Sequence, residues 1–586
     1  MTATAVSAPP NDPPPADDAT VGVIQRRRPP RAFQRSYSHW GLLGALLFFS
    51  GSLVPSLLPR SGVAQGLVSG ITAVIGYGFA CAFVSLWHYV QGPVPHGNAR
   101  RWTLRVITGL LTVVLAASVW NFVGWQNDTR QIFGMDPISP TVWPEIVVVG
   151  MLVAWLLLAV GRGFRTLFRK SADFVDRWLP RRLAVTLSSI LTLLIIWGLL
   201  SGAILDVFFA GANAIFSTRD SGDKPFATET TSEYRSGGPE SLVKWDDLGR
   251  QGRDFISRTP QVEDINAVSG GGAKEPIRVY VGLKSADTVQ GRADLVLQEL
   301  QRTGAFDRKA IIIGSTTGTG WLDPNAMDPI DYMYNGDDAI AGVQYSYLPS
   351  WISLFADQEI VQETAQTVFT TIHDYWVTLP ERSRPQLYMF GLSLGSFGAE
   401  SVMTDPNIIN APLDGALLAG PPFFNPLHTF LTDRREAGTP EWNPTYGDGR
   451  TVRFTAQEDL LNRNEGTWGP NTRMVYLQHG SDGVTWFNAS LLYRSPDWLK
   501  PGERAPDVSD HMQWYPIITM WQVAMDLAGA GGAPSGFGHE YSVNDYSQAW
   551  AGVFDIEGWT DAQTDAVSAA VQAEHDAFDA RIAAAE

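Results

Sequence analysis

Ser393 lies at the centre of a Gly-x-Ser-x-Gly pattern, between Gly391 and Gly395, directly after the apolar run 387–390. A serine at a sharp strand-to-helix turn exposes its hydroxyl, and glycines two residues before and after it remove side chains that would clash there. Such a serine can attack a carbonyl carbon once a base removes its proton. Because the chain contains 56 glycines, chance matches are common, and the meaning of the pattern depends on its surroundings.

Two later residues could complete this chemistry. Asp482 follows an apolar strand signal, and His539 lies in the glycine-containing stretch 536–541. With Ser393 they stand in the order serine, carboxylate, histidine, in which the histidine takes the serine proton and the carboxylate orients the imidazole. The alternatives are an ordinary turn residue for Asp482 and a surface-loop histidine for His539.

A glycine-rich stretch, 314–321, follows the apolar run 310–313. Its backbone N–H groups can face a ligand, and the N–H of Thr316 or its neighbour, together with that of Leu394, could form an oxyanion hole. A phosphate cradle is the rival interpretation. No Gly-Lys-Ser/Thr follows the glycines, which argues against the cradle.

His511, directly after Asp510, is the second candidate for the base, although it precedes a helix signal instead of ending the domain. The other histidines are expected to be structural, and His479 in particular to donate to the backbone at a strand end. No His-Glu-x-x-His pattern is present and the only cysteine is Cys81, so neither a metal nor a cofactor is expected. The acidic run 323–338 could bind Ca²⁺, but a solvated loop is the favoured interpretation.

The elements that must position these residues alternate between strands and helices. The strand signals are 277–281, 310–313, 343–347, 387–390, 416–419 and 474–478, and the clearest helix signals between them are 293–302 and 358–377. This alternation predicts a mostly parallel sheet with helices on both faces, in which reactive groups gather at the carboxyl ends of the strands. No clear final strand stands between the helix signal at 514–527 and His539.

A long insertion, about 421–471, separates the last two strand signals and is expected to form a lid. Its aromatic residues could line an apolar acyl-binding channel together with aromatics near the strand ends. The residues concerned are Phe423, Phe424, Trp442, Phe454 and Trp468 in the insertion, and Trp321, Tyr345, Tyr347, Trp351 and Trp486 outside it. The alternative is core packing, which aromatic side chains favour in any protein.

Five apolar runs near the N-terminus approach or exceed the ~20 residues that a helix needs to cross a bilayer. They are 40–58, 66–90, 104–125, 146–164 and 183–210. Basic residues cluster before the first run and in alternate loops, whereas the other two loops carry only Arg60 and Arg130. This asymmetry predicts a cytoplasmic N-terminus and an extracytoplasmic remainder. The fifth run contains Asp206, so an even count, which would reverse the placement, is the main alternative.

The net charge of −17 is unevenly spread. Residues 1–211 carry 17 Lys and Arg against 9 Asp and Glu, and the remainder carries 26 against 51. Such an acidic body repels phosphate backbones, so no nucleic-acid partner is expected. The predicted divisions are a disordered basic and Pro-rich tail (1–35), a five-helix transmembrane region (36–211), an extracytoplasmic neck with a helix at 241–257 (212–275), a catalytic domain (276–560) and a C-terminal helix (561–586).

Taken together, the motifs resemble the actinobacterial multi-pass membrane proteins with a C-terminal α/β-hydrolase catalytic domain. The resemblance rests on residues 314–321, 344–351, 391–395, 420–423, 476–482, 484–486 and 538–541. It implies an α-helical transmembrane region followed by an α/β-hydrolase domain, with Ser393 as nucleophile and His539 as base. Relatives are expected to have Glu at Leu392 and Pro at Gly483, and neither departure removes a reactive atom.

The sequence therefore predicts a serine esterase or lipase, anchored in the cell membrane by several spans, that acts outside the cytoplasm on acyl esters of envelope lipids or glycolipids. An acyltransferase with the same residues is the nearest alternative, because both reactions share an acyl-enzyme. A non-catalytic envelope scaffold is an alternative from another class. The oligomeric state is left open.

Overall fold

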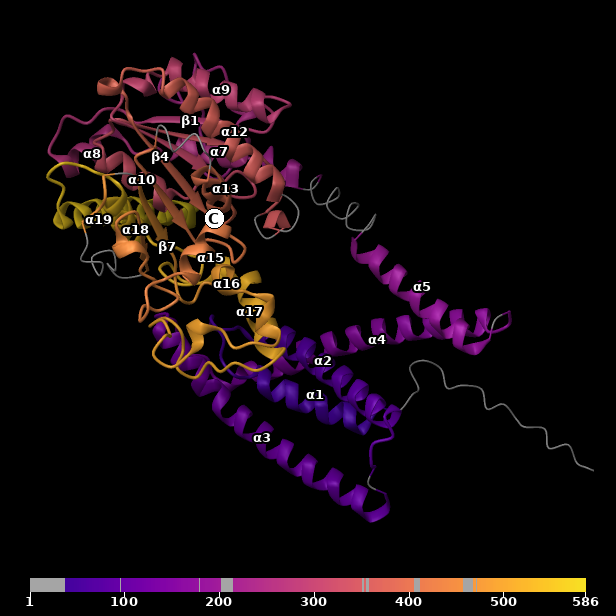
Figure 1. Cartoon of the computed structure of the whole chain (residues 1–586). Helices are drawn as coiled ribbons and strands as arrows, with labels where there is room; N and C mark the ends of the chain where they lie inside the picture. Colours follow the sequence, from indigo (N-terminus) through magenta and orange to yellow (C-terminus); the bar gives the residue numbers. More distant parts are fainter. Residues whose placement is uncertain are drawn as a thin grey trace, which may run out of the picture.

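The computed structural model describes residues 37–585 except 95, 179, 202–213, 215, 350–351, 355–357, 405–411, 457–466 and 471. The chain forms a helical region followed by a domain built on one sheet (Figure 1). The long helices of the helical region are α1 (His39–Ser52), α2 (Gly62–Tyr89), α3 (Gly97–Ile132), α4 (Trp143–Val175) and α5 (Arg181–Ser201). Many of their large apolar side chains are exposed, as expected for helices that face lipid.

Within the described residues, three helical segments are long and apolar enough to cross a membrane: Gly62–Tyr89, Gly97–Ile132 and Pro140–Val175. They correspond to the second, third and fourth predicted runs. The first run is helical only to Ser52, because prolines at positions 55 and 59 cannot continue a helix. With 14 residues, α1 is about 21 Å long, shorter than a bilayer core. The fifth run lies partly outside the described residues, so the count of five spans stays a prediction.

The sheet has seven strands, all parallel, in the order β1-β3-β2-β4-β5-β7-β6. The strands are β1 (Ile277–Val281), β2 (Ala310–Ser315), β3 (Asp338–Val343), β4 (Gln386–Leu392), β5 (Gly415–Ala419), β6 (Val452–Thr455) and β7 (Arg473–Leu477). They are apolar and buried almost throughout, as a sheet covered on both faces requires. The predicted α/β architecture is confirmed.

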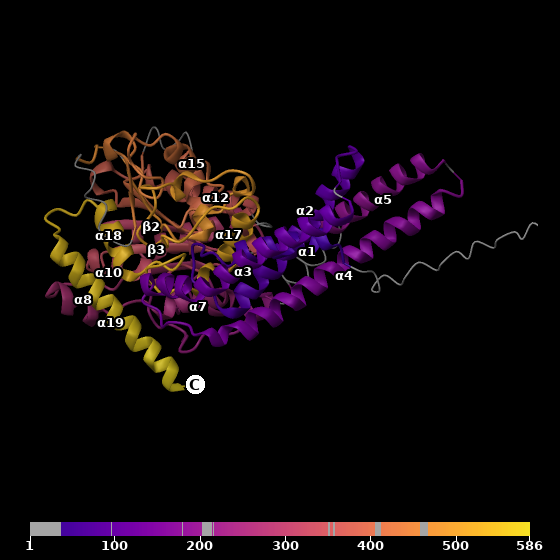
Figure 2. The same ribbon diagram turned by 90° about the horizontal axis from the view of Figure 1, so that it is seen from below.

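Helices on the two faces follow from right-handed crossovers. The connections that advance along the sheet order pass through α9 (Val289–Arg302), α12 (Gln358–Trp376) and α13 (Leu394–Met403), which pack together. One of the connections that run back, from β2 to β3, passes through α10 (Pro324–Met333), which packs with α18 (Val543–Val553) and α19 (Asp561–Ala585). Figures 1 and 2 show these two groups on opposite sides of the sheet.

Four local expectations are corrected. The strand expected at 343–347 is β3, which ends at Val343, so the following residues lie beyond its carboxyl end. The insertion is not only a lid, because it contributes edge strand β6. The helix expected at 241–257 is interrupted at Gly249, whose φ of +72° starts the separate helix α7 (Gly249–Ser257). The predicted neck also extends the sheet edge, since Arg278 N–H donates to Tyr234 O (3.2 Å).

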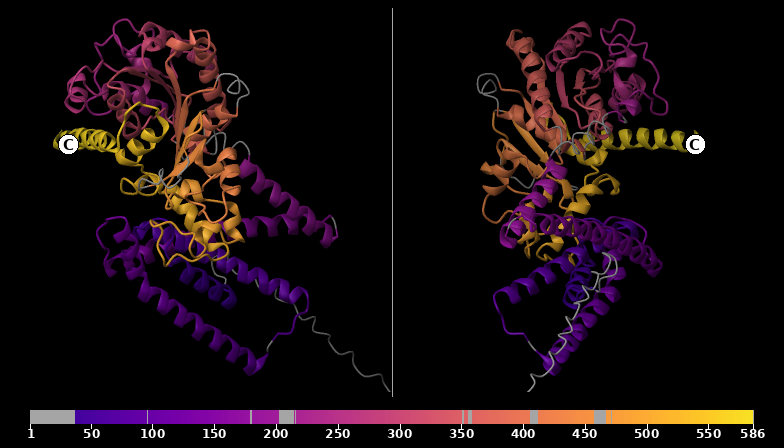
Figure 3. Two further views of the ribbon diagram at one scale, coloured as in Figure 1. Left: turned by 60° about the vertical axis from the view of Figure 1, so that its left-hand side comes forward. Right: turned by 90° about the vertical axis from the view of Figure 1, so that its right-hand side faces the viewer.

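The helical region meets the sheet domain through the segment that follows β7, drawn in orange and yellow in Figure 3. This segment contains α16 (Gly483–Trp486) and α17 (Ile518–Ala528). Ser56 Oγ donates to Asp526 Oδ1 (2.8 Å), and the Arg60 guanidinium lies 3.7 Å from the same oxygen in a fully buried ion pair. In the described residues between α17 and His539 there is no strand, and β6 occupies the sheet edge beyond β7. Two further α-helices of the domain are α8 (Val262–Ser269) and α15 (Pro426–Asp433).

Candidate functional site

Ser393 occupies the turn between the central strand β4 and helix α13, as the glycine pattern predicts. Its backbone has φ 55° and ψ −126°, a conformation that a non-glycine residue adopts only when the surrounding structure enforces it. A Cβ on Gly391 would clash with the carbonyl of Gly395, and a Cβ on Gly395 would clash with the carbonyl of Ser315. Both glycines are therefore required by close backbone approach, and the turn projects Ser393 from the carboxyl end of β4.

His539 and Asp482 form a direct contact. His539 Nδ1 donates to Asp482 Oδ2 at 2.7 Å, and the Asp482 side chain is completely buried. Val484 N–H donates to Asp482 Oδ1 (2.8 Å), which makes Asp482 the N-cap of α16. Burial alone would raise the pKa of the Asp482 carboxyl. The charge and hydrogen bond of His539 and further donors outweigh that effect, so the pKa lies below its ordinary value.

The other ring nitrogen of His539, Nε2, is buried and has no hydrogen-bond partner within the described residues. Buried polar atoms are usually paired, so an unpaired ring nitrogen is a notable exception. With Nδ1 protonated toward a carboxylate, Nε2 of the neutral ring is an acceptor. The ring is thus arranged to accept a proton.

Ser393 and the His539 ring meet at the end of β5. Ser393 N–H donates to Ala419 O (2.9 Å), and the next residue, Gly420, lies against the imidazole. A Cβ on Gly420 would come within 2.5 Å of His539 Cε1. The elbow and the imidazole therefore both contact the backbone at the end of β5.

The loop that carries His539 is fixed by the strand-end residues before Asp482. Gly538 N–H donates to Ser481 Oγ (2.9 Å), and His479 Nδ1 donates to Gly538 O (2.9 Å). His479 thus donates to backbone, as predicted. Its Nε2 lies 3.4 Å from Asp545, and that carboxylate helps to raise the pKa of His479 against the opposing effect of burial.

The two candidate oxyanion donors lie on segments that touch. Thr316 is buried and its Oγ1 donates to Val343 O (2.7 Å), so the loop after β2 is anchored to β3. Gly395 packs against the backbone carbonyls of Ser315 and Thr316. Leu394 is the first residue of α13, where an N–H has no acceptor within its own helix. The arrangement brings both segments to the same side of the elbow.

The second candidate base lies elsewhere. His511 is half exposed, and its Nε2 lies 3.1 Å from Asp128 Oδ2 on α3. It therefore belongs to the boundary between the helical region and the sheet domain, while His539 is the histidine that Asp482 contacts. The sequence order alone could not exclude His511, because its partner is almost 400 residues away.

Sequence reasoning missed Tyr541 as a functional neighbour. Its buried hydroxyl donates to Asp482 Oδ2 (2.8 Å), the same oxygen that accepts from His539. In the sequence, the only indication of this role was that Tyr541 stands two residues after His539. Gly420 was also missed as a constraint on the ring, because its role depends on contact with a residue more than a hundred positions later.

Several of the aromatic residues expected in an acyl channel are packed in the interior. Trp442 and Trp486 lie with Trp498 in a buried cluster, and Phe454 belongs to β6. Beside the elbow, the apolar cluster that includes Leu394 also contains Tyr345, Leu354, Val361 and Phe397, with Phe424 packed against it. The core-packing interpretation thus accounts for several of these rings, and the apolar cluster beside the elbow is itself largely buried.

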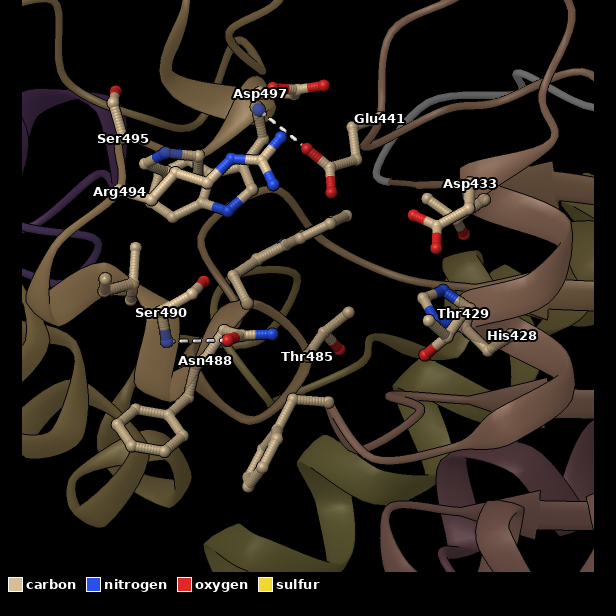
Figure 4. Close-up of a pocket in the computed structure, with 17 residues that line it drawn as sticks. His428, Thr429, Asp433, Glu441, Thr485, Asn488, Ser490, Arg494, Ser495 and Asp497 are labelled. Carbon is tan, nitrogen blue, oxygen red and sulfur yellow. Dashed lines mark hydrogen bonds between the residues drawn. The ribbon is translucent and has the colours of Figure 1, made fainter.

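The cavity beside the insertion is polar, with a volume of about 220 Å³ (Figure 4). Asp433, Glu441 and Arg494 point toward its interior in the close-up, and Asn488 and Thr485 lie on the opposite side. Glu441 accepts a hydrogen bond from the backbone of Trp498 (2.8 Å), which does not involve the elbow. This cavity is not the apolar channel that the aromatic residues suggested.

The acidic run 323–338 is not a solvated loop. Asp328 and Asp331 are buried on α10, where both pair with the Arg278 guanidinium at 2.8 and 2.5 Å. Asp338 is buried beside Asp331, and burial raises the pKa of both carboxyl groups. Over the described part of the chain, no group of three His, Cys, Asp or Glu side chains could hold a metal ion.

Comparison with protein families adds a second line of information to this geometry. A model described as "Alpha/beta-hydrolase family" matches residues 277–567, and one described as "Alpha/beta-hydrolase family N-terminus" matches residues 53–260. The chain belongs to this α/β-hydrolase family. Its helical region is therefore a family feature, and a hydrolytic activity in the general sense follows from membership. No match was found among curated proteins or among solved structures.

Proposed function

We propose that this protein is a membrane-anchored serine hydrolase that cleaves carboxylic esters, with Ser393, His539 and Asp482 as its catalytic triad. The observation that carries the proposal is the state of the His539 ring. One nitrogen is bonded to a buried carboxylate and the other is buried without a partner, while the ring and the strained serine both lie against the end of β5. A serine nucleophile with a histidine base needs a carboxylate on one ring nitrogen and an acceptor nitrogen left open for the serine proton.

In the proposed reaction, His539 Nε2 takes the proton from Ser393 Oγ as this oxygen forms a bond to the ester carbonyl carbon. The N–H groups of Leu394 and Thr316 stabilise the oxyanion of the tetrahedral intermediate. When the intermediate collapses, the C–O bond to the leaving alcohol breaks and His539 gives the proton to that alcohol. A water molecule then repeats the sequence on the acyl-enzyme and releases a carboxylic acid and free Ser393.

The proposed substrates are acyl esters of envelope lipids or glycolipids, reached from outside the cytoplasm. The three apolar spans hold the sheet domain next to lipid. Arg100 and Arg101 lie at the start of α3, and the basic residues of α4 lie in its second half, both at the end of the bundle remote from the sheet domain (Figure 1). Since basic loops favour the cytoplasmic side, this arrangement supports an extracytoplasmic sheet domain.

An acyltransferase is the second candidate. The polar cavity beside the insertion could accommodate a hydroxylated acceptor, which would replace water in attacking the acyl-enzyme. Product that forms from an activated ester only when a glycolipid acceptor is supplied would favour this candidate over the hydrolase.

Labelling with a fluorophosphonate tests the triad directly. Membranes containing the full-length wild-type protein are expected to be labelled, whereas Ser393→Ala is not labelled. Asp482→Asn retains an oxygen for the Val484 N–H but loses the charge, and it is expected to slow labelling by about 10³-fold or more. Ser401→Ala, on the same helix α13, is the matched control and should label like wild type. Equal labelling of wild type and Ser393→Ala would contradict the proposal and favour a non-catalytic scaffold.

A further inference from the structure

A second and larger cavity, of about 480 Å³, lies on the β2 side of the sheet's carboxyl edge. Its walls come from three parts of the chain: the segment that enters the sheet domain from the helical region, 216–224; the start of α7; and the loops after β2 and β3. A volume of this size is in the range of small-molecule sites. Nothing in the proposed triad uses this cavity.

One wall of the cavity is cationic, although the domain as a whole is strongly acidic. Arg219, Lys224 and Arg250 all line it. Arg219 is exposed, Lys224 is paired with Asp254 (2.7 Å), and Arg250 donates one hydrogen bond to the carbonyl of residue 223 (2.8 Å). Three cations around one cavity favour an anionic ligand, and guanidinium groups suit phosphate oxygens in particular.

One carboxylate also lines the cavity. Asp220 is buried, and its Oδ1 accepts from Arg250 N–H (3.1 Å) and from Gln344 Nε2 (3.2 Å). Asp220 Oδ1 thus already accepts two hydrogen bonds within the protein. The cationic side chains outnumber this carboxylate, so the cavity retains a positive surplus.

Other residues that line the cavity form a wall with groups for hydroxyls and for carbon–hydrogen faces. Gln251 Nε2 donates to Thr319 Oγ1 (3.2 Å), while its Oε1 is buried and has no partner in the described part of the chain. Trp321 and Tyr347 contribute aromatic faces. A ligand with hydroxyl groups on a short carbon skeleton would satisfy this wall, since its hydroxyls can bond the amide and its carbons can pack on the rings.

The cavity is linked to the proposed active site through one loop. Thr317, which lines it, directly follows Thr316, the proposed oxyanion donor. The loop is anchored by Gln344 Nε2, which donates to Thr319 O (3.0 Å), and by Tyr280, whose hydroxyl donates to Gly320 O (2.6 Å). A substrate whose ester carbonyl lies at Ser393 can therefore extend its polar part across this loop into the cavity.

We propose that the cavity binds the anionic polyol head group, a phosphorylated polyol in chemical class, of the lipid whose ester is cleaved at Ser393. This inference rests on the proposed function and adds the substrate class. Its position beside the segment that leaves the helical region suits a head group at the surface of a bilayer. The acyl ester lies toward the apolar cluster around Leu394 and Phe397, and the phosphate lies toward Arg219 and Lys224.

Binding is measured with the full-length Ser393→Ala protein in phosphatidylcholine nanodiscs, so that turnover does not interfere. The probes are glycerol 3-phosphate, glycerol and inorganic phosphate. We expect glycerol 3-phosphate to bind at least tenfold more tightly than either of the others. Arg219→Gln, which breaks no described ion pair, and the double variant with Lys224→Gln should weaken that binding at least tenfold. Arg450→Gln, at an exposed arginine that lines neither cavity, is the matched control and should leave it unchanged.

Two results would overturn the inference: equal affinity for glycerol 3-phosphate and glycerol, or unchanged affinity in both charge variants. Binding of inorganic phosphate as tight as that of glycerol 3-phosphate, with no effect of Gln251→Ala, would show a site for free phosphate and would also reject a head-group site.

An activity measurement separates this inference from the proposed function. In the otherwise wild-type enzyme, Arg219→Gln should raise KM for phosphatidylglycerol about tenfold and leave hydrolysis of 4-nitrophenyl butyrate unchanged. If the butyrate ester is cleaved but KM for phosphatidylglycerol does not change, the head-group inference fails alone. If neither ester is cleaved and no fluorophosphonate labelling occurs, the proposed function fails, whatever the binding results.

Discussion

At the scale of single residues, the His539 ring is constrained from three sides. Asp482 holds Nδ1, Gly420 approaches the ring at Cε1 and Nδ1, and Tyr541 shares the carboxylate oxygen. The hydrogen bond from Tyr541 helps to fix the orientation of the Asp482 carboxylate. The carboxylate in turn selects the ring tautomer of His539 in which Nδ1 carries the proton. The proposed base therefore depends on residues that never touch the substrate.

The contact at Gly420 leads to a prediction with a matched control. Gly420→Ala would place a Cβ 2.5 Å from His539 Cε1 at a residue with φ +50°. We expect fluorophosphonate labelling to slow by at least a hundredfold while the protein stays folded. Gly438→Ala imposes an alanine on a similarly left-handed residue (φ +90°), but its Cβ meets nothing within 4 Å. Equal loss in both variants would show that backbone strain, and not displacement of the ring, is responsible.

Asp323 leads to a prediction about pH. This carboxyl is the N-cap of α10, and burial, assisted by the negative charge of Glu540, raises its pKa to about 7 despite a hydrogen bond from Asn325 N–H. Between the ordinary value and 7, the folded state binds more protons than the unfolded state, so the wild type loses stability as pH rises through this range. The amide of the Asp323→Asn variant does not titrate, so the variant lacks this pH-dependent loss of stability.

We therefore expect the stability of Asp323→Asn, relative to wild type, to increase between pH 5 and pH 8 by about 3 kcal/mol. Thermal unfolding of the full-length protein in detergent, followed across this pH range, measures the change. If the difference in stability between the two proteins did not change with pH, the raised pKa of Asp323 would be contradicted. Asp510→Asn, at a fully exposed carboxylate, provides the control.

At the scale of elements, loops of the helical region support the loop that carries His539. Phe133, just after α3, is buried and stacks on Phe537 with ring centroids 4.6 Å apart. Leu58, between α1 and α2, lies against Gly538. Through the Ser56 and Arg60 contacts with Asp526, the same region also fixes α17, whose backbone packs on Gly483 beside Asp482. The helical region thus positions parts of the site besides anchoring it.

The stacked pair gives a test of this coupling. Phe133→Ala is expected to lower kcat about tenfold, because the loop of His539 loses the ring on which it packs, a change of about 1.4 kcal/mol in the barrier. Phe537→Ala should have a similar effect, and the double variant should be little worse than either single one. Phe83→Ala, at a residue of α2 that is 64% exposed, is the control. Fully additive losses would show that the two rings do not act together.

At the scale of the whole molecule, the start of α3 and the second half of α4, which carry basic residues, lie at the end of the helical bundle remote from the sheet domain, as Figures 1 and 3 show. Three long apolar helices in the described part of the chain support association with a membrane. The orientation across that membrane is a prediction from charge asymmetry.

Impermeant thiol reagents can test the orientation. In a Cys81→Ser background, Glu240→Cys introduces a thiol at an exposed position in the sheet domain, and Asn98→Cys introduces one at the exposed start of α3. We expect the thiol at position 240 to be labelled in intact cells and the thiol at position 98 only after lysis. The reverse pattern would place the sheet domain in the cytoplasm.

The sequence by itself determined the elements with strong local patterns. Apolar runs predicted six of the seven strands, with one of them displaced, and the glycines around Ser393 predicted its turn, because both signals arise between residues close together in the chain. The motif order also singled out Asp482 and His539. Basic loops and apolar runs likewise located the membrane helices, since hydropathy and loop charge are properties of short segments.

Only the tertiary structure decided features that depend on contacts between distant residues. It placed His511 against Asp128, added β6 to the sheet edge, and buried several aromatics that were candidates for a channel. It also joined Gly420 and Tyr541 to the triad candidates. Pairing, burial and cavity shape are set when separate elements pack, and no pattern within one segment reports which partner a side chain will meet.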